Sequence, residues 1–334
     1  MPEKYHNPLW PLDFAWSLVF REEFLVSIHF MAEQDKKVVV LLTTFNGAKY
    51  LSAQLESLLG QVDVEISVIV NDDGSSDDTM QILNFWREKG LISQINISER
   101  IGSSVGFLQL LRKTEGADLV AFCDQDDIWE PRKLISMIQM MKHDEPCMVF
   151  SGRSLIDKNG HDLAKERKKR QVLRPSFSNA LVENVASGNC TLLNNKAVKI
   201  LNLYSHPPIV HYDSWIYLIM TGVGSSIYTH LDLVKYRIHD GNSVGLRRFG
   251  ISIKLKAVYE FAQQANYLNN SGKVELKTDS QLILDRYLNL FRPANFIIST
   301  FRIILYPINR QSFLDAVFYK LLLIYLLVIQ RRYI

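Results

Sequence analysis

The chain of 334 residues has few cysteines and no long apolar run. Its three cysteines, Cys123, Cys147 and Cys190, are widely spaced, which excludes a disulfide framework and a zinc-ligand spacing. We therefore expect a reducing, cytosolic setting. No segment reaches the ~18 uncharged apolar residues that a transmembrane helix needs, and the nearest approach, residues 321–329, is too short alone.

Two phosphate-binding signatures are also missing. The sequence has no glycine-rich dinucleotide fingerprint and no P-loop. The formal net charge of +3 gives no reason to expect general affinity for nucleic acids. Hydrophobic content of 47% and charged content of 22% are ordinary for a globular protein, so the chain can form a sizeable core.

Short apolar runs alternate with amphipathic stretches between residues 38 and 151. The runs predict strands, with helices between them, over residues 38–44, 66–70, 95–97, 119–123 and 147–150. Such alternation predicts an α/β fold with a mostly parallel central sheet and helices on both faces. In sheets of this kind, ligands bind beyond the carboxyl ends of the strands.

Acidic residues follow the strand predicted at 119–123. Asp124, Asp126 and Asp127 would repel one another unless a cation, usually Mg²⁺ or Mn²⁺, neutralised them. The alternative is a solvated acidic turn that caps the next helix, since Pro131 lies near a first helical turn.

A second acidic strand end lies upstream. Asp72 and Asp73 precede Gly74 and Ser75, an arrangement that can hydrogen-bond the imide of a pyrimidine and bring backbone amides near a ligand. A tight turn with a helix cap would explain the same residues.

Taken together, residues 43–47, 71–79 and 124–129 resemble the inverting family 2 nucleotide-sugar glycosyltransferases of the GT-A fold. The run Cys-Asp-Gln-Asp-Asp-Ile-Trp at 123–129 resembles bacterial rhamnosyltransferases in particular. Residues 188–191 and 211–215 are similar to the family's acceptor-side strand and catalytic-base segment, and residues 236–239 to its closing loop. The resemblance covers roughly residues 36–246, in the family's order.

The resemblance implies roles for individual residues. The nucleotide-sugar contacts it implies are Thr44, Phe45, Asn46, Asp73, Gly74, Asp124 and Arg237, the last as a phosphate clamp. The divalent metal, Mg²⁺ or Mn²⁺, would be held by Asp126 with Asp124 and His239. The general base would be Asp213, and acceptor contacts would come from Gly188, Trp129 and Trp215.

Each role has a plainer alternative. Asp213 is also suited to cap a helix, His239 to make a structural hydrogen bond, and the two tryptophans to be buried. Family members often carry an aromatic residue after the base, where this chain has Ser214, a departure that puts the form of the acceptor pocket in doubt. Should Asp213 not be the base, Glu183 is the next candidate.

The implied reaction is transfer of a sugar with inversion, L-rhamnose from dTDP-L-rhamnose being the first expectation, to a glycan or lipid-linked acceptor in bacterial cell-surface polysaccharide synthesis. One alternative is a sugar nucleotidyltransferase, although residues 43–49 hold only one glycine. Another is an inactive binding protein of the same fold. The presence of Asp73, Asp124, Asp126 and Asp213 argues against inactivity.

The two ends of the chain differ from its middle. We expect residues 1–35 to be a loosely attached extension, with Met31 a natural start, and residues 36–249 to form the transferase domain, divided at residue 151 into nucleotide-sugar and acceptor halves. Residues 250–334 are expected to be helical. From Arg286 onward the sequence has seven basic residues and one acidic residue among mostly apolar ones. This predicts peripheral binding to the inner face of the plasma membrane, and the alternative is a helical subdomain packed on the core.

Overall fold

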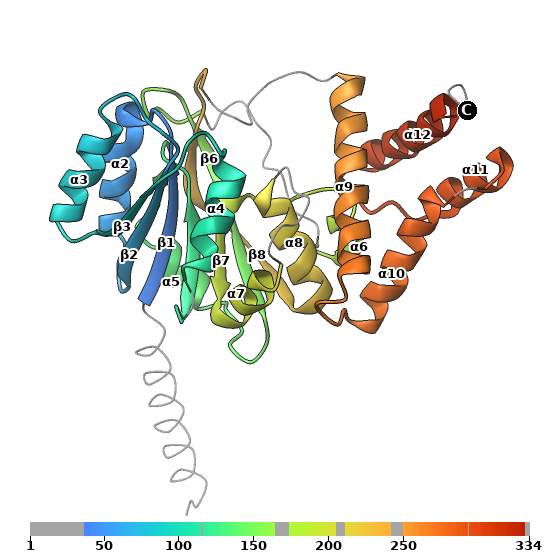
Figure 1. Cartoon of the computed structure of the whole chain (residues 1–334), viewed down its shortest axis with the longest axis horizontal. Helices are drawn as coiled ribbons and strands as arrows, with labels where there is room; N and C mark the ends of the chain where they lie inside the picture. Colours follow the sequence, from blue (N-terminus) through green and yellow to red (C-terminus); the bar gives the residue numbers. More distant parts are fainter. Residues whose placement is uncertain are drawn as a thin grey trace, which may run out of the picture.

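The computed structural model describes residues 37–114, 116–163, 174–204, 211–241, 250–292 and 294–330. The extension expected at residues 1–35, including Met31, lies outside this range. Within the described residues the strands form one eight-stranded sheet in the order β3-β2-β1-β4-β7-β6-β8-β5 (Figure 1).

The first half of the sheet is parallel. Its strands are β1 (Lys37–Thr44), β2 (Glu65–Asp72), β3 (Ile92–Ile97) and β4 (Leu119–Cys123), and neighbouring pairs all run in the same direction. All five residues of β4 are buried. Strands covered on both faces read as continuous apolar runs, which is why the sequence located them.

Helices cover both faces of this half. Val38, Val40 and Leu42 of β1 pack in one hydrophobic cluster with α2 (Ala48–Leu59) and α3 (Thr79–Glu88). Leu41 and Phe107 belong to the other cluster, Phe107 lying on α4 (Ser103–Arg112). Successive strand residues point to opposite faces, so this division into two clusters confirms the predicted α/β layers.

The second half of the sheet is mixed. Strand β7 (Thr191–Asn194) is antiparallel to both β4 and β6 (Cys147–Ile156), whereas β8 (Ser225–Arg237) is parallel to β6. The two-residue strand β5 (Ile128–Trp129) is antiparallel to β8. Four of the seven pairings between described strands are parallel, in agreement with a mostly parallel sheet.

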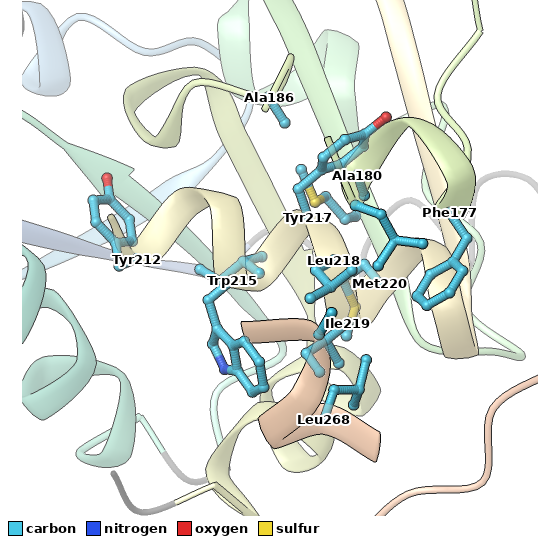
Figure 2. Close-up of a cluster of buried hydrophobic side chains, with 14 of the residues drawn as sticks. Phe177, Ala180, Ala186, Tyr212, Trp215, Tyr217, Leu218, Ile219, Met220 and Leu268 are labelled. Carbon is cyan, nitrogen blue, oxygen red and sulfur yellow. The ribbon is translucent and has the colours of Figure 1, made fainter. Parts of the chain in front are cut away.

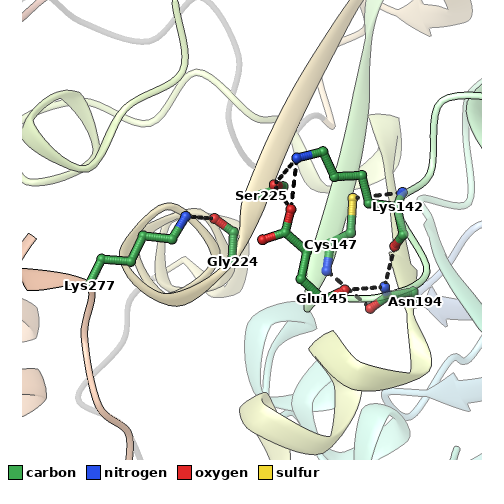
Figure 3. A network of polar contacts seen from close by, with 7 residues as sticks. All are labelled: Lys142, Glu145, Cys147, Asn194, Gly224, Ser225 and Lys277. Carbon is green, nitrogen blue, oxygen red and sulfur yellow. Dashed lines mark hydrogen bonds and ion pairs between the residues drawn. The ribbon is translucent and has the colours of Figure 1, made fainter.

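A polar network links β6, β7 and β8 at the end of the sheet where β6 and β8 begin (Figure 3). The Asn194 side chain donates to the carbonyl oxygens of Lys142 and Glu145, and accepts from the amide of Cys147 at 3.1 Å. The Lys142 ammonium pairs with Glu145 at 2.8 Å and donates to Ser225 at 3.1 Å. These contacts join the start of β6 to the start of β8 and the end of β7.

Helix α8 (Tyr212–Val223) is apolar on almost all sides and is therefore buried. Figure 2 shows Trp215, Leu218 and Ile219 of this helix beside Phe177 of α6 (Phe177–Ala180) and Leu268 of α9 (Ile251–Ser271). Short helical segments, α5 (Lys133–Ile138), α7 (Asn195–Asn202) and a 3₁₀ turn at Gly188–Cys190, complete this part of the molecule.

The C-terminal region continues with α10 (Thr278–Leu288), a 3₁₀ turn (Asn289–Phe291), α11 (Phe296–Leu305) and α12 (Phe313–Gln330), which lie on the other side of α9 from α8 in Figure 1. Leu268 and Tyr287 share a hydrophobic cluster with Trp215. The Lys277 amide donates to the carbonyl oxygen of Gly222. The Lys277 ammonium donates to the carbonyl oxygen of Gly224 (Figure 3). Among the described helices, none has both the length and the apolar character needed to cross a bilayer.

Candidate active site

The carboxyl ends of several strands meet at one edge of the sheet. Thr44 pairs with Asp72, and Leu42 with Cys123, so β1, β2 and β4 end together. Because β7 is antiparallel to both β4 and β6, and β8 is parallel to β6, strand β8 also ends at this edge, at Arg237. The predicted common rim is confirmed for the first three strands, and β8 adds a further contributor that the sequence did not reveal.

A glutamine clamps the loop that follows β1. The amide of Phe45 donates to Gln125 Oε1 at 2.8 Å, and Gln125 Nε2 donates to the carbonyl oxygen of Phe45 at 3.1 Å. A Cβ added to Gly47 would lie 2.2 Å from Gln125 Oε1, so the end of the Gln125 side chain would have to move away from Phe45. Sequence reasoning pointed to the carboxylates on either side of Gln125 and not to Gln125 itself. Its position between Asp124 and Asp126 was the feature that could have indicated a role in the site.

Two side chains expected at the nucleotide hold the loops to each other. Thr44 Oγ1 donates to Asp72 Oδ2 at 2.7 Å. Asn46, at φ +46°, donates its amide to Ser75 Oγ at 2.9 Å and accepts from the amide of Ser76 at 2.8 Å. Asn is among the residues that tolerate this left-handed conformation. Phe45 differs from both, since it is 40% exposed at the rim.

Asp73 is held by the loop before α4. Ser98 Oγ and the amide of Ile101 donate to Asp73 Oδ1, and the amide of Gly102 donates to Oδ2, each at 2.8 Å. Burial alone would raise the pKa of Asp73, but the bonds from the Gly102 and Ile101 amides outweigh it and lower the pKa. The next residue, Gly74, has φ +81°, a conformation that favours glycine.

The acidic turn after β4 concentrates negative charge. Burial, and then the charges of Asp127 and Asp126, raise the pKa of Asp124 well above its ordinary value. Burial and the charge of Asp126 raise the pKa of Asp127 to about 6. Asp126 Oδ2 lies 2.8 Å from His239 Nε2, and the two side chains are 14% and 16% exposed. The turn thus presents one carboxylate, already paired with a histidine, beside two that resist ionisation.

Arg237 stabilises the same turn. Its Nε donates to the carbonyl oxygen of Asp126 at 2.8 Å, its amide donates to Asp127 Oδ1 at 3.0 Å, and Nη1 donates to the carbonyl oxygen of Asp157 at 3.3 Å. The residue is 4% exposed. In this structure the guanidinium supports the backbone of the acidic turn, and the phosphate contact expected of Arg237 stays a prediction. The Tyr50 ring contacts it, at 4.7 Å from the guanidinium to the centroid.

Trp129 does not offer a surface for a sugar. It is 2% exposed, and the Lys133 ammonium lies 3.1 Å from its ring centroid. That ammonium also donates to the carbonyl oxygen of Asn189 at 2.6 Å, and burial lowers its pKa to about 7. Asn189 Nδ2 in turn donates to Asp127 Oδ2. Trp215 is 1% exposed. Both tryptophans are thus packed in the interior here, and the acceptor contacts expected of them stay a prediction.

Asp213 lies in the first turn of α8, with Gly188 against it. The amide of Gly188 donates to Asp213 Oδ2 at 3.3 Å and that of Ser214 donates to Oδ1 at 2.8 Å. The N-cap position is His211, so capping by Asp213 is not its role here. Burial raises the pKa of Asp213 despite the charge of His211 and these amide bonds, and Asp213 is among the charges that raise the pKa of Asp124.

Gly188 and Glu183 are both held by neighbours. A Cβ on Gly188 would lie 1.9 Å from the Tyr212 hydroxyl, which explains glycine at this position. Glu183 is 6% exposed, pairs with Arg310 at 3.6 Å and accepts from the amide of Gln311 at 2.9 Å. These contacts attach Glu183 to the C-terminal region, and its expected place as the next candidate base stays a prediction.

Comparison with known proteins decides the family. The model described as Glycosyl transferase family 2 matches residues 39–201. Residues 39–201 belong to glycosyl transferase family 2. The family match contains the acidic turn and Gly188, while α8 with Asp213 follows it.

The similar proteins are glycosyltransferases. An uncharacterized glycosyltransferase of Nostoc sp. is 28% identical over 128 residues, which span 37% of this chain and 38% of that protein. The dTDP-rhamnosyl transferase RfbG of Shigella flexneri is 27% identical, covering 66% of this chain and 77% of the relative. The UDP-Glc:alpha-D-GlcNAc-diphosphoundecaprenol beta-1,3-glucosyltransferase WfgD of Escherichia coli is 25% identical, covering 64% and 82%.

Solved structures confirm the GT-A fold. The mannosyltransferase PcManGT from Pyrobaculum calidifontis, in complex with GDP-Man and Mn²⁺, aligns with a TM-score of 0.53 at 16% identity, covering 86% of this chain and 82% of that one. The likeness extends beyond the family match and includes much of the C-terminal half.

The metal-ligating side chains of this family 2 domain fit a metal ion that is also held by a diphosphate. The described part of the chain has no group of three or more histidine, cysteine, aspartate and glutamate residues placed to hold a metal ion. It does have the Asp126–His239 pair at the rim. Mg²⁺ and similar ions are commonly held by one or two protein side chains plus substrate phosphates and water, so two donors are enough.

Proposed function

We propose that this glycosyltransferase moves a sugar from a nucleotide-sugar donor to a glycan or lipid-linked acceptor, with inversion at the anomeric carbon, in cell-surface polysaccharide synthesis. The observation that carries the proposal is that two carboxylates in different environments lie near the same turn. Asp126 pairs with His239 at the strand ends, while Asp213 lies within electrostatic range of the same turn and is half-buried beside Gly188.

Asp213 is proposed as the general base. Inverting transfer needs one group to take the proton of the acceptor hydroxyl while its oxygen attacks the anomeric carbon and the bond to the diphosphate breaks. A carboxylate whose pKa is raised by burial is a stronger base at neutral pH than an ordinary one. Gly188, whose amide holds Asp213, is proposed to border the acceptor.

The donor is proposed to lie over the loops after β1 and β2. Phe45 offers an exposed ring, and the amides of Ile101 and Gly102 hold the carboxylate of Asp73 beside Gly74. Thr44 and Asn46 would shape this region mainly by fixing the loops, and Asp124 would lie near the ribose or the metal. Asp126 and His239 would hold a divalent metal, Mg²⁺ or Mn²⁺, which neutralises charge on the leaving nucleoside diphosphate.

L-Rhamnose from dTDP-L-rhamnose is the first donor to test. Its support is the likeness of residues 123–129 to rhamnosyltransferases and the name of the Shigella relative. The names of WfgD and PcManGT make UDP-glucose and GDP-mannose the comparison donors. A donor at 100 times its dissociation constant stabilises the native state by about 2.7 kcal/mol, so thermal unfolding with each donor and Mn²⁺ ranks the candidates.

The reaction type is tested by the product. The preferred donor is incubated with the protein and a divalent metal, and nucleoside diphosphate and pyrophosphate are measured separately. Slow, metal-dependent release of nucleoside diphosphate without acceptor is expected. Release of pyrophosphate would identify a nucleotidyltransferase instead, and release of neither, with donor bound, would identify an inactive binding protein.

A further inference from the structure

The two C-terminal helices α11 and α12 expose apolar side chains on their outer surfaces. In α11 the exposed set is spaced along one helical face: Ile297, Ile298, Phe301, Ile304 and Leu305, between 45% and 75% exposed. In α12 a second stripe follows a near-heptad spacing: Leu314, Val317, Leu321, Tyr325 and Val328, between 39% and 77% exposed. Phe313, at the start of α12, is 80% exposed.

The opposite sides of the same helices are apolar too. Ile303 of α11 and Tyr319, Leu322 and Leu323 of α12 are buried in the cluster that also contains α8 and α10 residues. A helix on the surface of a soluble protein normally turns polar side chains outward. The pair α11–α12 therefore has one apolar surface buried in the molecule and a second that remains uncovered, which marks an interaction surface.

The sequence that contains this surface is strongly basic. From Arg286 to the end of the chain the sequence has seven basic residues and one acidic residue, Asp315. Arg286 and Arg292 are exposed. Arg302 and Lys320 donate to backbone carbonyl oxygens of Asn289 and Ile304, neutral acceptors that do not cancel the positive charge.

We propose that α11 and α12 dock on the surface of an anionic lipid bilayer. Apolar side chains would enter the interface between head groups and acyl chains, and the basic residues would attract anionic head groups. A second copy of this chain fits less well, because a two-fold interface sets the same surface against itself and would bring the two positive regions together.

The connection between α11 and α12 is attached to the acceptor side of the active site. Asn309 donates to Ser178 at 3.0 Å, Gln311 donates its amide to Glu183 at 2.9 Å, and Arg310 pairs with Glu183 at 3.6 Å. Five residues after Glu183, the amide of Gly188 contacts Asp213. Docking would thus hold the proposed base near the bilayer surface, where a lipid-linked acceptor is presented. This last step rests on the proposed function, whereas docking itself does not.

The test is sedimentation of the full chain with vesicles of phosphatidylcholine, alone or with about 30% phosphatidylglycerol, at about 0.05 and 0.5 M salt. Binding is expected to increase with the anionic lipid and to decrease with salt. The triple variant Phe301→Ser, Leu305→Ser, Leu314→Ser should bind at least about 100-fold more weakly, since three apolar side chains no longer enter the interface.

Matched controls separate this surface from apolar exposure in general. Leu59→Ser, Phe85→Ser and Ile97→Ser together remove three side chains that are 64%, 53% and 69% exposed on α2, α3 and β3, and vesicle binding should be unchanged. Arg286→Gln with Arg292→Gln should weaken binding to anionic vesicles by about fivefold per residue and leave binding to phosphatidylcholine unaltered. Thermal unfolding of each variant establishes that it is folded.

Three results would overturn the proposal. The first is a wild-type chain that ignores vesicles of every composition, and the second is a folded triple variant that binds as well as wild type. The third is a dimer in light scattering that the triple variant converts to a monomer, which would identify a second copy as the occupant. Donor hydrolysis without vesicles is measured in parallel: vesicle binding without nucleoside diphosphate release would refute the proposed function while leaving the lipid surface intact.

Discussion

Replacement of Asp213 by asparagine tests the proposed base with little change of shape. The amide oxygen can keep the 2.8 Å hydrogen bond from Ser214, while the longer one, 3.3 Å from Gly188, is removed. One neutral hydrogen bond is worth about 1 kcal/mol. Burial already disfavours the charged carboxylate, so removal of that charge offsets part of this cost and the variant should fold normally.

The effect on turnover should be much larger. A positioned general base contributes about 10²–10⁴ in rate, so Asp213→Asn should slow glycosyl transfer at least 100-fold, equal to about 2.7 kcal/mol in the barrier. Donor affinity should stay within about twofold, because the proposed donor region lies over the loops after β1 and β2.

The assay is the initial rate of nucleoside diphosphate release with saturating donor and acceptor, alongside calorimetric titration of the donor. The wild-type rate should rise as the pH passes through the raised pKa of Asp213, because only the deprotonated carboxylate accepts a proton. The rate of the variant should not show this rise. Asp144→Asn, at an exposed site before β6, serves as the control. Retention of more than about a tenth of wild-type activity would refute the assignment.

Three further substitutions probe the rim. Asp126→Ala should abolish Mn²⁺-dependent donor binding in titrations and leave thermal stability equal or higher, because it removes one of several repelling carboxylates. Gly47→Ala should weaken donor binding, measured in the same way, because its methyl group would lie 2.2 Å from Gln125 Oε1 and displace the loop after β1. Gly188→Ala should reduce stability by about 1–3 kcal/mol in denaturant titrations, since the methyl group would lie 1.9 Å from the Tyr212 hydroxyl.

Glycines elsewhere provide controls for the last two. Gly60→Ala meets nothing closer than 3.4 Å, and Gly250→Ala nothing closer than 3.6 Å. Both should bind donor and unfold like wild type. If Gly188→Ala were as stable as Gly250→Ala, the close approach to Tyr212 would not be the reason for glycine there. Metal-dependent donor binding by Asp126→Ala at wild-type affinity would refute the metal assignment.

The parallel half of the fold could be predicted because the residues that mark its strands are neighbours in the sequence. Strands β1, β2 and β4 are apolar runs that are largely buried, and their polar ends are visible in the sequence, as at Thr44 and Asp124. Parallel strands place such ends together, so the rim followed from the pattern alone.

The rest depends on contacts between distant residues. Arg237 was expected to meet phosphate, yet its environment is set by β5 and β8, whose pairing joins residues more than 100 positions apart. Trp129 has the sequence context of a binding-site aromatic, but the buried ammonium of Lys133 covers its ring. No regular spacing of apolar residues predicts either contact, and no pattern in the sequence marks the short strand β5.

The two-residue strand β5 has a consequence for the order in which the protein is made. Asp126 is synthesised more than a hundred residues before Arg237 and His239, the partners that fix its turn and pair with its carboxylate. Contacts so distant in sequence form after local ones, because the intervening chain must first be ordered. A nascent chain that has completed β4 can assemble the parallel sheet with its acidic turn exposed and unpaired. The Asp126–His239 pair proposed to hold the metal is therefore assembled late, and a chain released before β8 would retain the loops proposed to bind the donor without it.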